Sequence, residues 1–157
     1  MNKPIYALSI KQPYAWLICK GFKDIENRDW RIGRNPNYGL YKSETANFRI
    51  ELPQRIYVHA GVSKSELSKE TLDWILKRLN NKQAMELMFH YKIQTQVPCL
   101  FSLGAIVGEV TITDCVTESE SLWFIGKYGF VLVDPVLYDR PILCKGQLGF
   151  FKPEIKQ

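Results

Sequence analysis

The 157-residue chain is 46% hydrophobic and 24% charged, a composition that is ordinary for a folded globular protein and excludes disorder as its main state. Its length suits one domain and argues against a second independent core. The formal net charge of +5 favours a polyanionic partner only weakly, since many proteins with mixed surface charge carry as much.

The cysteines and the N-terminal residues bear on the compartment. The start MNKPIYALSIKQ lacks the apolar stretch and the small-residue cleavage site of a signal peptide, and no apolar run is long enough to cross a bilayer. We therefore predict a cytoplasmic protein with no membrane partner. The cysteines lie far apart, form no C-x-x-C pair and mostly occupy apolar runs, as buried free thiols in a reducing compartment do: Cys19, Cys99, Cys115 and Cys144.

The N-terminal segment predicts a strand followed by a short helix. The run IYALSI alternates as a short strand does. Pro13 then stands at an allowed first-turn position of a helix of about two turns, and Gly21 is its C-terminal stop. The apolar residues of this helix share one face, with Trp16 off it, so we expect the helix to plug a core while part of its other side stays available.

A polar strand and a long loop are predicted next. The segment Lys23–Trp30 alternates so that Glu26 and Arg28 lie on one side, which suits a strand whose polar side lines a groove. Residues Arg31–Asn47 contain several Gly, Pro and Asn residues. They are interpreted as a loop that is longer than usual and is therefore either functional or mobile.

The middle of the chain predicts a strand and two helices. RIYVHAG is a compact strand. Leucines and isoleucines at helical spacing predict an amphipathic helix over Ser65–Leu79, with Ser65 as a possible cap. Residues Gln83–Phe89 predict a second helix, and Val97–Leu103 a loop that leads into a strand.

The strongest strand pattern is LGAIVGEVTITDCV, in which Gly104 and Gly108 supply the bend or bulge that closes a barrel. The remaining segments predict a helical turn, a strand ending at Pro135 and a last strand: SESLWF, YGFVLVDPVLY and CKGQLGFFKP. Together these elements predict an α+β fold, a mixed β-barrel with peripheral helices. We expect a single domain over residues 1–157, with an inserted helical segment around residues 65–90.

Several runs resemble the ASCH domain family, in the order that the family has them. LSIKQPYAWLICKGFKDIENRDW is similar to its opening signature, and GAIVGEVTITDCV, WFIGKYGFVLVDP and CKGQLGFF resemble its later strands. Such ordered matches are more specific than any one of them, and they cover most of the chain apart from Arg31–Arg55 and Leu67–Leu103. The resemblance implies a PUA-like barrel with a cleft between the first helix and the sheet, and it implies RNA-related roles.

Some bacterial members of that family, similar at the GxK segment, hydrolyse the acyl amide of acetylated cytidine or act as ribonucleases. In the amidohydrolase branch the matching lysine acts as a catalytic base or nucleophile beside a threonine. Here Lys23 keeps the lysine, while Glu26 stands at the threonine position and pairs with Lys23 or Arg28 rather than offering a hydroxyl. The branch also uses a glutamate beyond the long central strand, where this chain has Glu118 and Glu120.

Lys23 and Glu26 are the candidate catalytic residues. Lys23 is catalytic if a low-dielectric cleft depresses its pKa, since only the neutral amine takes protons or attacks carbonyls. Otherwise it is a solvated lysine at the start of a strand. Glu26 and Arg28 point the same way on an alternating strand, either as an ion pair that holds the groove wall or as a ligand-recognition pair.

Candidate ligand-binding residues surround the predicted groove. Lys11, Gln12 and Trp16 lie at the start of the first helix, where free backbone N–H groups and a flat ring bind a phosphate and stack a base. Trp16 as a core residue is the alternative interpretation. Trp30, which follows the polar strand and precedes the long loop, is the better stacking candidate.

His59 lies at the end of an apolar strand, where it is a general acid or base, a hydrogen-bond donor to phosphate, or a structural histidine. Tyr128 either rims the same cleft or belongs to an ordinary turn. We expect no metal or cofactor, because His90 is far off in a helical context and the cysteines lack ligand spacing. Ser63 and Ser65 have no nucleophile elbow around them, which argues against a serine hydrolase.

The predicted function is the binding of RNA or a nucleoside-like small molecule through a basic cleft beside the first helix. The alternative is a hydrolase that acts on acetylated cytidine or RNA through Lys23, and a protein-interaction domain that uses the central helix comes third. The oligomeric state is left open. If the cleft exists, we expect seven residues to converge on it: Lys11, Gln12, Lys23, Glu26, Arg28, Trp30 and His59.

Overall fold

The structure is a computed structural model, and it describes residues 3–32, 40–42, 47–96 and 102–156. In chain order its elements are β1 (Tyr6–Ile10), α1 (Tyr14–Cys19), β2 (Ile25–Arg28), β3 (Leu40–Lys42), β4 (Asn47–Arg49), β5 (Gln54–Ala60), α2 (Lys69–Leu76), α3 (Asn81–Gln96), β6 (Ala105–Val116), β7 (Tyr128–Leu143) and β8 (Phe150–Phe151).

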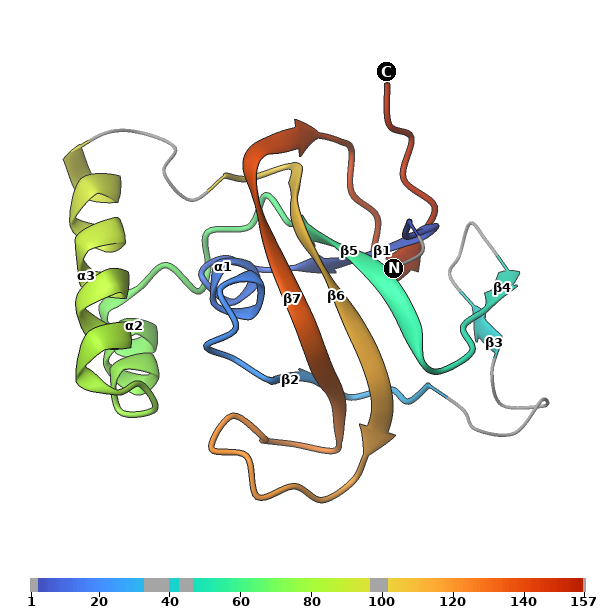
Figure 1. Cartoon of the computed structure of the whole chain (residues 1–157), viewed down its shortest axis with the longest axis horizontal. Coiled ribbons are helices and arrows are strands. Elements are labelled where there is room, and N and C mark those ends of the chain that lie inside the picture. Colours follow the sequence, from blue (N-terminus) through green and yellow to red (C-terminus); the bar gives the residue numbers. More distant parts are fainter. Residues whose placement is uncertain (1–2, 33–39, 43–46, 97–101, 157) are drawn as a thin grey trace.

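Six strands form one curled sheet in the order β2-β7-β6-β5-β1-β8, and β3 pairs with β4 in a separate two-stranded sheet. Strands β1 and β5 are parallel, while the other pairs in the large sheet are antiparallel. Figure 1 shows the long strands β6 and β7 side by side, with α1 at one end of the sheet and α2 and α3 beyond it. The α+β class and the mixed sheet agree with the prediction, and the sheet has the shape of a half-barrel.

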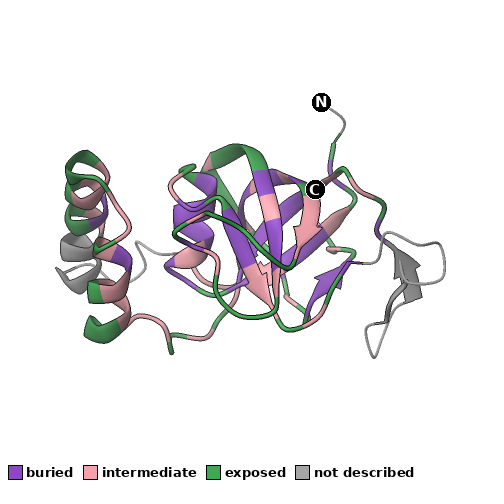
Figure 2. Ribbon diagram, turned by 90° about the horizontal axis from the view of Figure 1, so that it is seen from below, coloured by how far each residue is buried: buried purple, intermediate pink, exposed green. Residues whose placement is uncertain are grey.

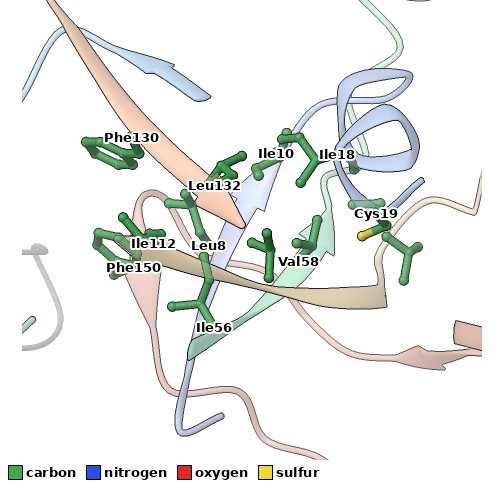
Figure 3. Close-up of a cluster of buried hydrophobic side chains, with 14 of the residues drawn as sticks. Leu8, Ile10, Ile18, Cys19, Ile56, Val58, Ile112, Phe130, Leu132 and Phe150 are labelled. Atoms are coloured by element: carbon green, nitrogen blue, oxygen red, sulfur yellow. The ribbon is translucent and has the colours of Figure 1, made fainter. Parts of the chain in front are cut away.

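The main core fills the inside of this curl. Figure 3 shows Leu8, Ile56 and Val58 from the central strands facing Phe130 and Phe150. Strand β5 is buried from its second residue to its last, as expected of a strand that is covered on both faces. Helix α1 closes one end of the curl through Ile18 and Cys19, so the prediction that it plugs a core is confirmed.

A second apolar cluster joins the helices to the sheet. It is built from residues of α1, β2, α2, α3 and the β6–β7 connection: Trp16, Leu17, Ile25, Ile75, Leu87 and Trp123. In Figure 2 the described parts of the two outer helices are mostly intermediate or exposed, and their buried residues are Ile75 and Leu87. Every residue of α1 after Tyr14 is buried, so the expectation that one side of α1 stays available was wrong.

The helix boundaries differ from the predicted ones because capping side chains set them. Helix α2 begins after Ser68, whose Oγ accepts the backbone N–H of Thr71, and Ser65 lies in the preceding loop. Helix α3 begins at Asn81, two residues before the predicted start, and runs to Gln96, seven residues past the predicted end. At its start Asn80 Oδ1 accepts the N–H of Gln83 and Gln83 Oε1 accepts the N–H of Asn80, which is a reciprocal capping box.

The strand predictions also need correction in places. Strand β7 continues past Pro135 to Leu143 because the proline lies in a bulge: Val133 pairs with Thr111 and Val136 with Glu109, which leaves one extra residue on β7. A proline at a bulge costs no ladder hydrogen bond. The SESLWF segment forms a turn without a helix, and β8 is a strand of only two residues.

The predicted loop Arg31–Asn47 contains a strand. β3 lies within it and pairs with β4, which begins at Asn47. The rest of that prediction, residues 33–39 and 43–46, and most of the predicted loop at 97–103 lie outside the described residues.

Candidate functional site

A cleft of about 1250 Å³ lies beside α1, where the curled sheet is open between its edge strands. Its walls come from the end of β1, the start of α1, β2, the segment after β5 and the loop between β7 and β8. On β2, Glu26 and Arg28 line the cleft. The side chain of Asn27 holds the β6–β7 connection, because it donates to Trp123 O and accepts from the N–H of Ile125.

Lys23 lines the cleft and is almost fully buried, with 3% of its surface exposed. Its Nζ donates to the backbone carbonyl of Ile25 and to Glu26 Oε2, the latter at 3.3 Å, and lies 5.5 Å from the centre of the Tyr14 ring. Burial lowers the pKa of Lys23, while the nearby charge of Glu26 opposes that shift. The amine is therefore easier to deprotonate than an ordinary lysine and stays next to a carboxylate.

Glu26 is shared between Lys23 and Arg28. Its second oxygen, Oε1, accepts from Arg28 Nε at 3.1 Å and lies 3.0 Å from Arg28 Nη2. Nη2 also donates to the backbone carbonyl of Ser9 at 2.7 Å, so Arg28 connects the edge strand β2 with β1 across the opening of the sheet. The prediction that Glu26 and Arg28 point the same way is confirmed, and they form the ion pair that holds the cleft wall, while ligand recognition by the pair stays a prediction.

His59 is held between three segments, with 1% of its surface exposed. Its Nε2 lies 2.8 Å from the carbonyl oxygen of Cys144 and its Nδ1 lies 3.2 Å from Ser9 Oγ. Gly146 approaches the ring so closely that an added Cβ would lie 2.8 Å from Nδ1, and Phe151 meets it edge-on at 5.5 Å. Burial lowers the pKa of His59, although the hydrogen bond to Cys144 opposes the shift.

Trp30 forms an aromatic part of the wall. Its ring meets Phe130 and Phe150 edge-on, with centroids 5.3 and 5.6 Å away, and the Arg28 guanidinium lies 5.6 Å from its centre. Trp30 is half-buried and lines the cleft. The core therefore fixes the orientation of a ring that also contacts the open space.

The opposite wall combines α1 with the segment after β5. Lys11 Nζ donates to Ser65 Oγ at 3.0 Å, and Tyr14 OH donates to Glu66 Oε2 at 3.3 Å. Burial, followed by the charge of Glu66, raises the pKa of Tyr14 to about 12, so this phenol stays protonated at neutral pH. The Tyr14 ring also meets Trp74 edge-on at 6.5 Å.

Six of the seven residues expected to converge line the cleft, and Gln12 does not. Its side chain is buried and turned back: Oε1 accepts the N–H of Trp16 at 3.0 Å, and Nε2 donates to Ser102 O at 3.1 Å. Gln12 thus satisfies one free N–H group of α1 itself. The prediction that Gln12 converges on the cleft was wrong for this reason, and phosphate binding at the helix start stays a prediction.

Trp16 and Tyr128 also lie away from the cleft lining. The Trp16 ring stacks on His90 at 4.9 Å and meets Phe22 edge-on at 5.7 Å within the second apolar cluster. Its interpretation as a core residue is therefore the correct one. Tyr128 begins β7 opposite Arg28 in the strand register, yet it is not among the lining residues.

The sequence did not point to several residues that line the cleft, among them Ser9, Glu66 and Trp74. Ser9 is a hydroxyl in an apolar strand, and its partner His59 is 50 residues away. Glu66 and Trp74 belong to the predicted helical insertion. No pattern within one segment connects these residues, although the lone hydroxyl in β1 was a signal that could have been followed.

The charge of the lining is mixed, whereas the sequence predicted a basic cleft. Among the described residues four cations line it, Lys11, Lys23, Arg28 and Lys145, against three carboxylates, Glu26, Asp29 and Glu66. Glu118 and Glu120 are exposed and do not belong to this lining. Three exposed apolar side chains also border the space: Val62, Ile125 and Leu148.

The described part of the chain has neither a candidate metal cluster nor a candidate membrane-spanning helix. It holds no cluster of three or more His, Cys, Asp or Glu side chains suited to a metal ion. None of its helices is long and apolar enough to cross a membrane. Cys19 and Cys144 are buried free thiols, and burial raises the pKa of Cys19 to about 12.

Comparison of the sequence with protein-family models and with curated proteins gives no match.

Proposed function

We propose that the cleft binds a nucleoside-like ligand, either free or within RNA, and that the chain is an ASCH-like domain with a PUA-like barrel. The observation that carries the proposal is the buried chain of charges Lys23–Glu26–Arg28 in the cleft, next to the fixed ring of Trp30. Fixed polar groups beside an aromatic wall recognise the edge and the face of a base.

The size and lining of the cleft suit such a ligand. A volume of about 1250 Å³ exceeds what a drug-sized ligand occupies, so a nucleoside with flanking groups has room. Arg28 and Lys23 supply donors, and Glu26 and Glu66 supply acceptors. With four cations against three carboxylates the lining favours an uncharged base and sugar over a long run of phosphates.

The resemblance to the ASCH family supports the same site. The segment that carries it, Gly21–Arg28, contributes Lys23, Glu26 and Arg28 to the cleft beside the first helix, where the family has its ligand cleft. The curled mixed sheet is compatible with a PUA-like barrel. The position of the Gly21–Arg28 segment and the shape of the sheet both support an ASCH-like domain, and neither depends on a single contact.

The test is retention of ligand by the purified protein. A short single-stranded RNA and free acetylated cytidine are each passed over immobilised protein at 50 and 200 mM salt. We expect retention of at least one of them, reduced about tenfold or more by Arg28→Met, since a charge-assisted hydrogen bond contributes about 1.5–3 kcal/mol. Lys127→Ala removes an exposed cation outside the cleft lining and serves as the matched control.

The salt series separates the two forms of the ligand. Retention of RNA that falls steeply with salt means that several phosphates are bound, whereas nearly constant retention of the nucleoside means that the base and sugar are recognised. If neither ligand is retained by folded protein at millimolar concentration, or if Arg28→Met and Lys127→Ala retain it equally, the cleft is not a nucleoside site.

A hydrolase remains the second candidate because of one observation, the buried amine of Lys23 with its lowered pKa and a carboxylate 3.3 Å away. An amine that loses its proton more readily than an ordinary lysine takes a proton when neutral and donates one when charged. Chromatography of acetylated cytidine and of RNA after incubation distinguishes this candidate. Product that forms with the wild type and is absent with folded Lys23→Ala makes the protein a lysine-dependent hydrolase, and intact substrates leave it a binding domain.

A further inference from the structure

We propose that Ser9 and His59 form a nucleophile–base pair in the cleft, oriented by the carbonyl of Cys144, which transfers an acyl group from a carboxylic ester or amide to water. The proposal goes beyond ligand binding and rests on the proposed function only for the place where the substrate lies. It uses different residues from the Lys23–Glu26 pair, so each idea can fail alone.

The register of two strands brings the pair together. β1 and β5 are parallel neighbours in which Ser9 lies opposite His59. Ser9 Oγ is 3.2 Å from His59 Nδ1, and His59 Nε2 is 2.8 Å from Cys144 O. A carbonyl oxygen only accepts hydrogen bonds, so Nε2 carries the proton and the lone pair of Nδ1 is left to accept the Ser9 hydroxyl. This is the order nucleophile, base and orienting acceptor.

The imidazole has one orientation available. Gly146 lies against it where any larger residue would collide, and Phe151 contacts it from the side. The ring is buried, and burial lowers the pKa of His59, so the neutral form that accepts a proton predominates at pH 7. A base whose position and tautomer are both fixed needs little reorganisation during a proton transfer.

A cation stands next to the nucleophile. Arg28 Nη2 donates to the carbonyl of Ser9 itself at 2.7 Å, so its guanidinium lies beside the residue whose hydroxyl would attack. Lys23 belongs to the same chain of charges through Glu26. Ser9 is half-buried and lines the cleft, which gives a substrate access to its hydroxyl. Donors placed beside a developing oxyanion are a large part of acyl-transfer catalysis.

The reaction balances with water as the co-reactant. Ser9 Oγ forms a bond to the acyl carbon of the substrate while its proton passes to His59 Nδ1. The carbonyl oxygen of the substrate becomes an oxyanion near Arg28. The bond from the acyl carbon to the leaving nitrogen or oxygen then breaks, and the leaving group takes the proton from Nδ1. Water attacks the acyl-serine in the same way, which releases the carboxylic acid and restores the Ser9 hydroxyl.

Other hydroxyls around the cleft lack this arrangement. Ser63 Oγ donates to Ser65 Oγ, and Ser65 Oγ also accepts from Lys11, so neither serine has a histidine partner in these contacts. Ser63 lines the same cleft at its exposed side. The reactivity of a side chain at position 63 can therefore be compared with that of the same side chain at position 9.

The experiment labels the full-length protein with a fluorophosphonate, which bonds to an activated serine with loss of fluoride, and maps the adduct by peptide mass spectrometry. We expect one adduct, on Ser9, that is absent in Ser9→Ala. We also expect His59→Gln to slow the labelling on the order of 100-fold or more, the usual contribution of a general base. Ser119→Ala removes an exposed hydroxyl outside the cleft lining and should label like the wild type.

A second variant keeps the test valid if His59→Gln does not fold, which circular dichroism will reveal. In Ser9→Cys the thiol replaces the hydroxyl beside His59, and we expect iodoacetamide to alkylate it at pH 7 at least tenfold faster than the thiol of Ser63→Cys. Equal rates at the two positions, or no fluorophosphonate adduct on Ser9 in folded wild-type protein, would overturn the proposal.

The ligand-retention assay is run on the same preparations. Retention without labelling of Ser9 rejects the serine–histidine pair and leaves the proposed function standing. Labelling of Ser9 without retention of RNA or acetylated cytidine rejects the nucleoside proposal, and the pair then acts on another acyl substrate.

Discussion

Lys23, Glu26 and Arg28 show how a buried charge is tolerated at the level of single residues. Glu26 uses both carboxylate oxygens, one for each cation, and all three side chains are mostly removed from solvent. Desolvation of such groups is expensive, and their mutual attraction offsets it only while each group keeps its partners. The three side chains therefore behave as a unit whose members cannot be removed singly at low cost.

Removal of the central carboxylate should be the most damaging change in this unit. We expect Glu26→Ala to lower the free energy of unfolding by about 3–5 kcal/mol, because it leaves Lys23 buried without its counter-charge. Urea unfolding measures the change. Glu86→Ala is the matched control, since its ion pair with Lys20 is exposed by roughly a third on each side and should contribute at most about 1 kcal/mol. Equal losses in the two variants would contradict the argument.

His59 should make stability depend on pH in a defined direction. Its pKa in the folded protein lies below the ordinary 6.5, so between the two values the unfolded chain binds a proton and the folded protein does not. Its contribution is therefore fully present above about pH 6.5 and declines as the pH falls toward the folded pKa. We expect urea midpoints of the wild type to drop more between pH 7 and pH 5 than those of His59→Gln. A drop of the same size in both proteins would mean that His59 has no such role.

At the level of elements, the contact of α1 with the long strands depends on a missing side chain. A Cβ on Gly108 would collide with the carbonyl of Val136 and would lie 2.6 Å from Cys19 Sγ. Strand β6 can therefore approach both β7 and α1 only with glycine at this position. The register also shifts here, between Ile106 and Gly108, so the glycine lies where the sheet bends.

Gly108→Ala tests this contact. We expect it to destabilise the protein by about 1–3 kcal/mol, the usual cost of overpacking, because β7 or α1 must move. The control is Gly61→Ala, since a Cβ there meets nothing closer than Ile10 O at 3.9 Å. Thermal melting of the two variants side by side gives the comparison, and a Gly108→Ala protein as stable as the control would show that the sheet adapts without cost.

At the level of the whole molecule, a second buried network holds the three central strands together. Arg55 on β5 contacts Glu109 on β6 at 2.8 Å and donates to the carbonyl of Asp134 on β7 at 2.5 Å, and Tyr138 OH donates to Glu109 at 2.5 Å. Burial acts to raise the pKa of Glu109, but the hydrogen bonds from Tyr138 and Arg55 outweigh it and lower that pKa. The network binds the bulge of β7 to the rest of the sheet.

Arg55→Met should loosen the sheet as a whole. We expect a loss on the order of 3 kcal/mol at pH 7, because Glu109 keeps only its bond from Tyr138. The loss should shrink as the pH falls below 4.5 and through the lowered pKa of Glu109, because the protonated carboxyl gains little from Arg55. Hydrogen exchange provides the measurement: amides of β5, β6 and β7 should all exchange faster. Faster exchange confined to β5 would contradict a role in joining the three strands.

Patterns within one segment were sufficient to predict most strands, α1 and the shared side of Glu26 and Arg28, because alternation and helical spacing are local properties. The contacts that complete the cleft were not predictable in this way. Ser9 meets His59 only because β1 and β5 pair across 50 residues, and Gln12 turns away from the cleft toward a carbonyl 90 residues along the chain. Strand β7 continues past its predicted end because Pro135 lies in a bulge of β7 itself.

The position of β1 between β5 and β8 has a consequence for a chain that is made from its N-terminus. β1 is synthesised long before its partner β8 and before the loop with Cys144 that touches His59. Phe151 and Phe150 pair with Ala7 and Leu8 of β1. Until these two phenylalanines are synthesised, this side of β1 is an apolar strand edge with unpaired backbone groups. Such an edge pairs readily with other chains. The unfinished chain is therefore the form of this protein most prone to aggregate, and the pairing of the two phenylalanines with β1 ends that exposure.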